Sequence, residues 1–300
     1  MKGRALRDSK RSDHARYSQN GYQPSQSFVF VDGHVHIYDC HPTERVFDGA
    51  WQHFQTVAAS HKDTVHFQGV LLFTESSGDQ VFTALAQTQG GTVGRWYVSA
   101  TEEANSLRLH RDDGAQLFVL AGRQLVCEER LEVSAYFVIE ALADGAPLTT
   151  LLAQIDHLGG VSALPWGVGK WFGERGKTVE NMLGYTGVPL MVSDNGGRPW
   201  FWPTPRLLRA ARHQGVPVLA GSDPLPKASE QQEAGSVGFI LQGALHTGLP
   251  AQDLKQRLLN LHDTPPHYGK REGMWGFVCN QFYMRVRRTR STVPDYSMMT

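Results

Sequence analysis

The stretch Phe28–His36 reads FVFVDGHVH, and the interpretation of the whole chain starts from it. Its first four residues are apolar, which predicts a buried strand, and polar residues close it. Because side chains alternate along a strand, Asp32, His34 and His36 are expected on one face at its carboxyl end. Two imidazoles at this spacing can bind one metal ion or two adjacent ions. Two hydrogen-bonded histidines at a polar strand end are the structural alternative.

The composition of the 300-residue chain is that of an ordinary globular protein, with 41% hydrophobic and 19% charged residues. Its 29 basic and 29 acidic residues give a formal net charge of zero, which argues against a protein that binds polyanions over its whole surface. Three widely spaced cysteines exclude a disulfide framework and a CxxC zinc site. No apolar run approaches the roughly 18 residues of a membrane span, and the start of the chain lacks the apolar core of a secretion signal. The sequence therefore predicts a cytoplasmic protein.

Both ends of the chain are polar and basic. Residues 1–27 carry six Lys and Arg against two Asp, and they are expected to form a disordered basic tail. An arm that touches nucleic acid or anionic lipid is the less favoured alternative. Residues 285–300 are expected to form a basic C-terminal tail or the polar end of a final helix. Residues 28–284 are then predicted to form a single domain, and their number suits an α/β barrel of about 250 residues.

Apolar runs alternate with helical stretches over most of this domain. Strands are predicted at 67–74, 161–165, 188–192 and 216–220. This rhythm predicts an α/β protein with a mostly parallel sheet, either a doubly wound sheet or a TIM-like, distorted barrel of seven or eight βα units, which the domain length favours. Residues 95–140 differ, because short β-rich segments follow one another closely there, like hairpins. In both architectures ligands bind beyond the carboxyl ends of the strands.

Two further strand ends carry an Asp. Asp223 follows the apolar run 216–220 within AGSDP, where it can serve as a metal ligand or a general base, or simply make a turn before a proline. Asp194 follows the run 188–192 within SDNGGR. Asp194 is a candidate ligand or base and Arg198 a candidate contact for an anionic substrate, while an Asn-Gly turn is the structural alternative.

Glu75 and Lys170 are candidates of a weaker kind. Glu75 ends the predicted strand 67–74, so its carboxylate can bridge toward the two histidines or lie at the start of a helix, where acids are favoured. Lys170 closes the glycine-rich turn WGVGK at 166–170, where it can contact an anion. The turn is not a Walker A motif, because the required spacing is absent.

The order of these motifs resembles the PHP (polymerase and histidinol phosphatase) superfamily of metal-dependent phosphoesterases, which are distorted βα barrels with up to three metal ions. VDGHVH at 31–36 is similar to the family's D-x-H-x-H, and GSD at 221–223 is similar to its G-S-D-x-H without the final His. At other positions the sequence departs from the family pattern: Thr74-Glu75-Ser76 stands for T-D-H, Gln124 stands for a Glu, and Glu132 and Leu164 each stand for a His.

The resemblance implies a function and a ligand set. The ligands carried over are His34, His36, Glu75, Glu132 and Asp223, which would hold one or two divalent ions such as Mn, Mg, Zn or Fe. The reaction implied is hydrolysis of a phosphoester by a metal-activated water. In this interpretation Asp194 or Asp223 is the general base, and Lys170 and Arg198 neutralise a small anionic substrate.

Two alternatives remain open at this point. The amidohydrolase superfamily also begins with H-x-H and would imply hydrolysis of a C–N bond or an ester, but two further histidines on middle strands are not evident. A catalytically decayed barrel that acts as a binding or scaffold protein is the other alternative, because several family ligands are replaced. The oligomeric state is not determined by the sequence.

Overall fold

The computed structural model describes residues 27–61, 64–185 and 187–291. Strands and helices alternate at both ends of the domain, as the hydrophobic pattern predicts, and six strands follow one another without a helix in the middle. In chain order the elements are β1 (Ser27–Val35), α1 (Thr43–Ser60), β2 (His66–Phe73), α2 (Val81–Gln87), β3 (Thr92–Val93), β4 (Trp96–Ala100), β5 (Ser106–His110), β6 (Gln116–Leu120), β7 (Gly122–Val126), β8 (Glu132–Tyr136), α3 (Leu148–His157), β9 (Val161–Trp166), α4 (Glu174–Leu183), β10 (Leu190–Asp194), α5 (Arg206–His213), β11 (Val218–Leu219), the 3₁₀ turn Ala228–Glu230, β12 (Gly238–Gln242), α6 (Pro250–Leu259), β13 (His267–Tyr268) and α7 (Met274–Ser291).

The strands form two mixed sheets, and the predicted TIM-like barrel is wrong. The eight-stranded sheet has the order β13-β12-β1-β2-β6-β5-β4-β3, and the five-stranded sheet has the order β11-β10-β9-β8-β7. Strands β1, β2 and β6 are parallel, as are β9, β10 and β11, and the remaining strands pair antiparallel. The β-rich segment predicted near 95–140 is confirmed, and it is the physical reason why the barrel prediction is wrong. Its hairpins extend both sheets with antiparallel strands instead of adding βα units.

Short sets of backbone hydrogen bonds, which we call seams, join the two sheets. At one seam, Gly33 N donates to Ala220 O at 3.0 Å and Asp223 N donates to His34 O at 2.9 Å. At the other, Glu75 N donates to Gly122 O at 3.1 Å. The first seam brings the carboxyl end of β1 against the segment that follows β11, although almost 190 residues separate them in sequence.

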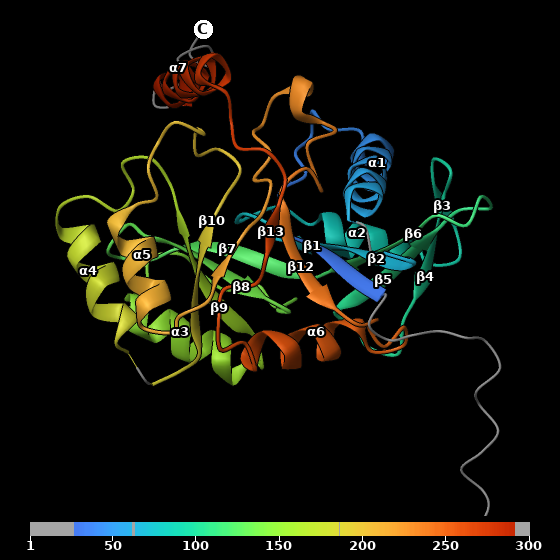
Figure 1. The fold of residues 1–300 in the computed structure, drawn as a ribbon, viewed down its shortest axis with the longest axis horizontal. Coiled ribbons are helices and arrows are strands. Elements are labelled where there is room, and N and C mark those ends of the chain that lie inside the picture. The colour runs from blue at the N-terminus through green and yellow to red at the C-terminus, as the bar shows by residue number, and fades with distance from the viewer. Residues whose placement is uncertain (1–26, 62–63, 186, 292–300) are drawn as a thin grey trace, which may run out of the picture.

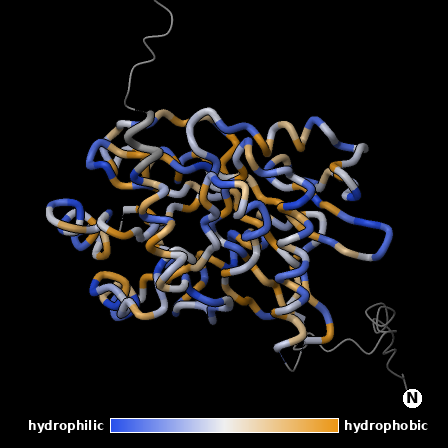
Figure 2. The backbone as a smooth tube through the Cα atoms, turned by 90° about the horizontal axis from the view of Figure 1, so that it is seen from above, coloured by the Kyte–Doolittle hydropathy of each residue, from blue (hydrophilic) through white to orange (hydrophobic). Residues whose placement is uncertain are grey.

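The two faces of β1 pack into different parts of the core. Phe28 and Phe30 pack with the buried faces of α1 and α2, whereas Val29 and Val31 belong to a second cluster between the sheets. Helices α3, α4 and α5 cover the five-stranded sheet, and α6 closes the cluster between the sheets from one end. In Figure 1, α6 and α7 lie at opposite ends of the molecule. The most hydrophilic stretches of the chain lie in loops at its periphery (Figure 2).

The ends of the chain bear on two predictions. Helix α7 continues through residue 284, the expected end of the domain, to Ser291. Residues 1–26 and 292–300 lie outside the described residues, and so does most of the predicted basic N-terminal tail with its alternative contact to nucleic acid. Within the described part of the chain, no helix combines the length and the apolar character that a membrane crossing needs.

Candidate metal centre

The end of β1 does not alternate regularly. Pairing with β2 is regular from Ser27 to Asp32 and shifts before Val35. Val35 lies in the same apolar cluster as Phe28 and Phe30, so the shift reverses the alternation of the strand. The prediction that Asp32 shares a face with His34 and His36 is therefore wrong. An irregularity of this kind exchanges the two faces of the strand, so the residues after it point to the side opposite to the one that strict alternation gives.

Asp32 instead fastens the loop that follows β11. Its fully buried carboxylate accepts hydrogen bonds from Ser222 N at 2.9 Å, Ser222 Oγ at 2.5 Å and Gly235 N at 2.6 Å. Burial raises the pKa of Asp32 to about 7, against the lowering effect of these hydrogen bonds. The bonds hold Ser222, and with it the next residue, Asp223, beside β1.

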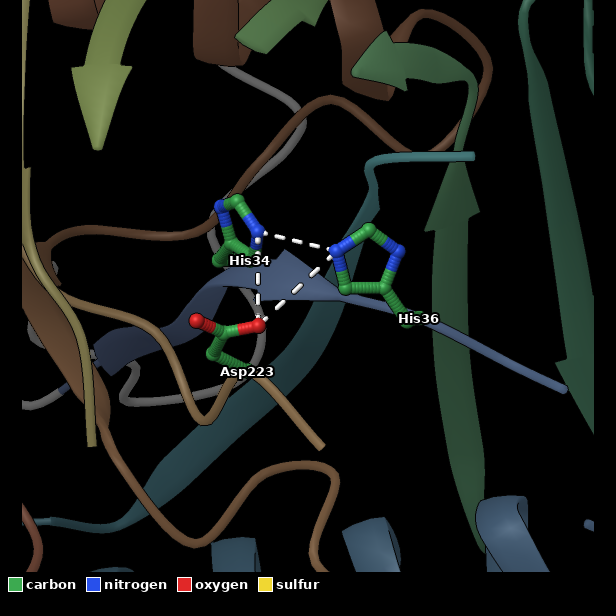
Figure 3. Close-up of side chains that lie close together, drawn as sticks. All are labelled: His34, His36 and Asp223. Carbon is green, nitrogen blue, oxygen red and sulfur yellow. Dashed lines mark hydrogen bonds and ion pairs between the residues drawn. The ribbon is translucent and has the colours of Figure 1, made fainter. Parts of the chain in front are cut away.

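His34, His36 and Asp223 point toward one another at the first seam (Figure 3). The two Nε2 atoms are 3.1 Å apart, and Asp223 Oδ1 lies 3.6 Å from His34 Nε2 and 3.8 Å from His36 Nε2. A point equidistant from these three atoms lies about 2.0 Å from each, which matches the ~2.0–2.2 Å between zinc and nitrogen or oxygen ligands. Asp223 adopts φ = 52°, a backbone conformation that costs energy for a residue other than glycine and is enriched at functional sites.

The protonation states of the three residues suit a cation. Burial lowers the pKa of His34, and burial together with the nearby His34 lowers the pKa of His36 to about 3. Burial disfavours the charged form of Asp223, but the imidazoles, when protonated, together with Lys170 and Asn195 outweigh it and lower the pKa of Asp223. Neutral imidazoles each carry a lone pair on one ring nitrogen, so this set can offer three acceptors to one point. A divalent metal ion fits such a donor set.

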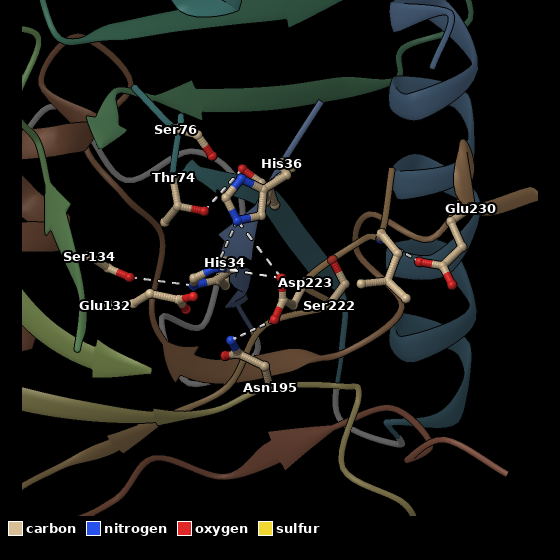
Figure 4. Close-up of polar contacts among 12 residues, drawn as sticks. His34, His36, Thr74, Ser76, Glu132, Ser134, Asn195, Ser222, Asp223 and Glu230 are labelled. Carbon is tan, nitrogen blue, oxygen red and sulfur yellow. Dashed lines mark hydrogen bonds and ion pairs between the residues drawn. The ribbon is translucent and has the colours of Figure 1, made fainter. Parts of the chain in front are cut away.

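Uncharged polar groups and the carboxylate of Glu132 lie around these three side chains (Figure 4). Asn195 Nδ2 donates to Asp223 Oδ2 at 3.2 Å, and Ser134 Oγ lies 3.4 Å from His34 Nδ1. Two buried acceptors, Asn195 Oδ1 and Gln124 Oε1, have no hydrogen-bond partner among the described residues. Sequence reasoning did not select Asn195 or Ser134, although Asn195 follows the selected Asp194 and Ser134 lies two residues after the selected Glu132.

Glu75, predicted as a ligand, lies away from the two imidazoles. Its carboxylate accepts the N–H of Phe82 at 2.6 Å in the first turn of α2 and pairs with Arg123 at 3.1 Å. Burial raises the pKa of Glu75, while the contacts with Phe82 and Arg123 lower it. The structure therefore places Glu75 in the helix-start position that was its alternative interpretation.

Asp194 and Arg198, predicted as base and substrate contact, bind each other. Arg198 Nε donates to Asp194 Oδ1 at 2.7 Å and Arg198 Nη2 donates to Asp194 Oδ2 at 2.6 Å, with both side chains buried. Arg198 Nη1 also donates to Trp202 O at 2.8 Å. This bidentate pair braces the loop after β10, and its charges already satisfy each other.

Glu132, predicted as a metal ligand, and Lys170, predicted as a substrate contact, also form a pair. Lys170 Nζ donates to Glu132 Oε2. Glu132 lies on the same face of β8 as Ser134, which contacts His34, so the pair stands beside the imidazoles. Both charged residues act electrostatically on His34.

A cleft of about 820 Å³ opens above this centre, and Asn195, Ser222 and Asp223 lie in its wall. Its volume is within the ~300–1,000 Å³ of small-molecule sites. Seven Lys and Arg and four Asp and Glu line it among the described residues. Arg198 and Lys170 pair with Asp194 and Glu132, and the five other basic residues still outnumber the four acids, which favours an anionic ligand. Trp275, Phe277 and Asn280 of α7 also line the cleft.

Comparisons by sequence give no match: no family model matches the chain, and no curated protein matches it. The fold is similar to that of PsfC from Pseudomonas syringae PB-5123, with a TM-score of 0.50 and 14% identity over 87% of this chain and 99% of that chain. A weaker similarity, with a TM-score of 0.44 and 8% identity, links 78% of this chain to 56% of the lesion-specific endonuclease PfuEndoQ from Pyrococcus furiosus. The likeness to PsfC concerns the fold alone. Membership of the PHP superfamily remains a prediction that rests on the order of the motifs.

Proposed function

We propose that this protein is a metal-dependent hydrolase that acts on a small phosphoester. The observation that carries the proposal is the convergence of His34 Nε2, His36 Nε2 and Asp223 Oδ1 around one point, about 2.0 Å from each. A divalent ion held by these three residues would supply Lewis acidity and would lower the pKa of water, which are the requirements of hydrolysis at neutral pH.

The chain itself contributes position and charge. Asp32 holds the segment of Asp223 against β1, and the Asn195 amide orients the Asp223 carboxylate from the other side. Asp223 is also the member of the three that lines the cleft, so a substrate reaches the centre past its carboxylate. In this proposal Asp194 is not the general base, because its two oxygens are bound by Arg198.

The excess of basic side chains in the cleft supports an anionic substrate, and the resemblance of the motifs to phosphoesterases supports a phosphoester. The volume of about 820 Å³ accommodates a small molecule. A substrate phosphate in the cleft would meet basic side chains at the start of α4 and just before α7, for instance Arg175 and Lys270.

The test combines metal analysis with a substrate panel. The wild type, the His34→Ala/His36→Ala variant and a His213→Ala control on the exposed end of α5 are purified, loaded with Mn²⁺ or Zn²⁺ and analysed for bound metal. We expect bound metal and phosphoester turnover in the wild type and the control, and loss of both in the double variant. Turnover of amides or carboxylic esters alone would contradict the phosphoester. Absence of bound metal in the wild type would contradict the hydrolase and leave a binding scaffold.

A further inference from the structure

Glu132 and Lys170 form a charged pair next to the candidate metal centre. The proposed function gives this pair no role. The PHP resemblance makes Glu132 a metal ligand, yet its carboxylate receives the Lys170 ammonium. Both side chains are partly shielded from solvent, with exposed fractions of 34% for Lys170 and 22% for Glu132. A half-buried, directly bonded pair is held more firmly than an exposed one.

The local backbone is shaped to bring Lys170 to this place. The lysine closes the turn after β9, where its N–H donates to Gly167 O at 2.9 Å. Its aliphatic stem lies over Gly167 so closely that a Cβ on Gly167 would stand 2.6 Å from Lys170 Cδ. Gly169 has φ = 77°, and Arg175 donates to its carbonyl at 2.7 Å. The turn therefore forms a cradle for the lysine stem and fixes the ammonium beside β8.

The ammonium stands among groups that would otherwise favour a second metal ion. Glu132 and Ser134 share one face of β8, and Gln124 lies opposite Ser134 on β7. The Gln124 side chain acts on the rings of His34 and His36, and its buried Oε1 makes no hydrogen bond of good geometry among the described residues. Together with Glu132 it would give a second cation two oxygen ligands next to His34. Lys170 and Asp223 both line the cleft, so the ammonium and the candidate centre face the same cavity.

We propose that the Lys170 ammonium takes the place of a second metal ion on Glu132, so that the centre holds one divalent ion and one resident cation. The proposal rests on the proposed metal site. A second divalent ion at Glu132 would lie next to the Lys170 ammonium, which already binds the Glu132 carboxylate. The two positive charges would repel each other at this distance. Lys170 also lines the cleft, and its ammonium has three donors, of which Glu132 takes one. A substrate anion can use another.

The test counts metal ions. Wild type, Lys170→Met and Lys170→Arg are dialysed against Mn²⁺ and analysed for bound metal and for the electron paramagnetic resonance of bound Mn²⁺. Methionine keeps an unbranched stem over Gly167 and removes the charge. We expect one equivalent in the wild type and in Lys170→Arg, and two equivalents with a spin-coupled spectrum in Lys170→Met. Lys177→Met is the matched control, because Lys177 pairs with Glu174 on the exposed surface of α4, and it should keep one equivalent.

A double variant identifies the ligand of the second ion. Glu132→Gln/Lys170→Met should return to one equivalent, with an affinity within about threefold of the wild type. A tenfold or greater loss of that affinity would make Glu132 a ligand of the first ion and overturn the proposal, and this measurement remains decisive if Lys170→Met alone does not fold. Two equivalents in the wild type, or one in folded Lys170→Met, would also overturn it while leaving the hydrolase intact. No metal in the wild type would contradict the proposed function itself.

Discussion

The segments at the ends of β10 and β11 are alike in sequence, but their carboxylates have different partners in the structure. Each apolar strand leads into a Ser-Asp pair, Ser193-Asp194 in one case and Ser222-Asp223 in the other. Asp194 meets Arg198 four residues later, and the two buried charges neutralise each other. Asp223 meets two neutral imidazoles from β1 and leaves three acceptors around one point. The comparison shows that a carboxylate at a strand end becomes a candidate ligand only where no cation of the chain already binds it.

The largest effect should come from breaking the pair at β10. Arg198→Met leaves the buried Asp194 with only the more distant Arg271, 3.8 Å away, and we expect a loss of about 3 kcal/mol in the free energy of unfolding, measured by urea denaturation. The double variant Asp194→Asn/Arg198→Met should recover most of this loss, since no uncompensated charge remains. A loss below about 1 kcal/mol in the single variant would show that the pair does not brace the loop.

The equivalent change at β11 should have a different signature. Asn tolerates the positive φ of Asp223, so Asp223→Asn should change the unfolding free energy of the metal-free protein little. Metal at one hundred times its dissociation constant should stabilise the wild type by about 2.7 kcal/mol, and the same concentration should stabilise the variant far less, because a ligand is lost. Thermal and urea denaturation with and without metal measure this difference. Glu180→Gln, on the exposed face of α4, is the control and should respond to metal like the wild type. An unchanged response in Asp223→Asn would remove Asp223 from the centre.

The smallest effect concerns His267 of β13, which contacts β11. His267 Nε2 contacts Val218 O of β11 at 2.7 Å, and burial lowers the pKa of His267. Val218 O and Asp194 oppose the shift, whereas Arg212 and Arg271 add to it. A folded pKa below the unfolded value of about 6.5 means that stability is complete above pH 6.5 and is lost as the pH falls toward the folded pKa.

His267→Gln should therefore lose less stability than the wild type between pH 7 and pH 5. Unfolding free energies at the two pH values check this. His213→Gln, at the exposed end of α5, should follow the wild type. An equal pH response in His267→Gln and the wild type would show that His267 is not held in its neutral form by the fold.

Much of the local structure could be predicted from the sequence. Apolar runs located β1, β2, β9, β10 and the segment of β11, and close spacing of β-rich segments located the hairpins between residues 95 and 140. Strand-end position selected His34, His36 and Asp223, which the structure brings together. These features follow from hydrophobic periodicity and chain direction, which are properties of short stretches of sequence.

Only the tertiary structure decided how the strands associate and which charges meet. The hairpins extended two mixed sheets, and the shift within β1 turned Asp32 away from the histidines, because both depend on strand partners distant in sequence. Glu75, Glu132 and Asp194 were candidates in sequence as well, although Asp223 was the better one. Each is bound by a cation of the chain in the structure: Arg123, Lys170 and Arg198, respectively. Ion pairing is decided by distances of a few ångströms between side chains, and those distances exist only once the sheets have packed.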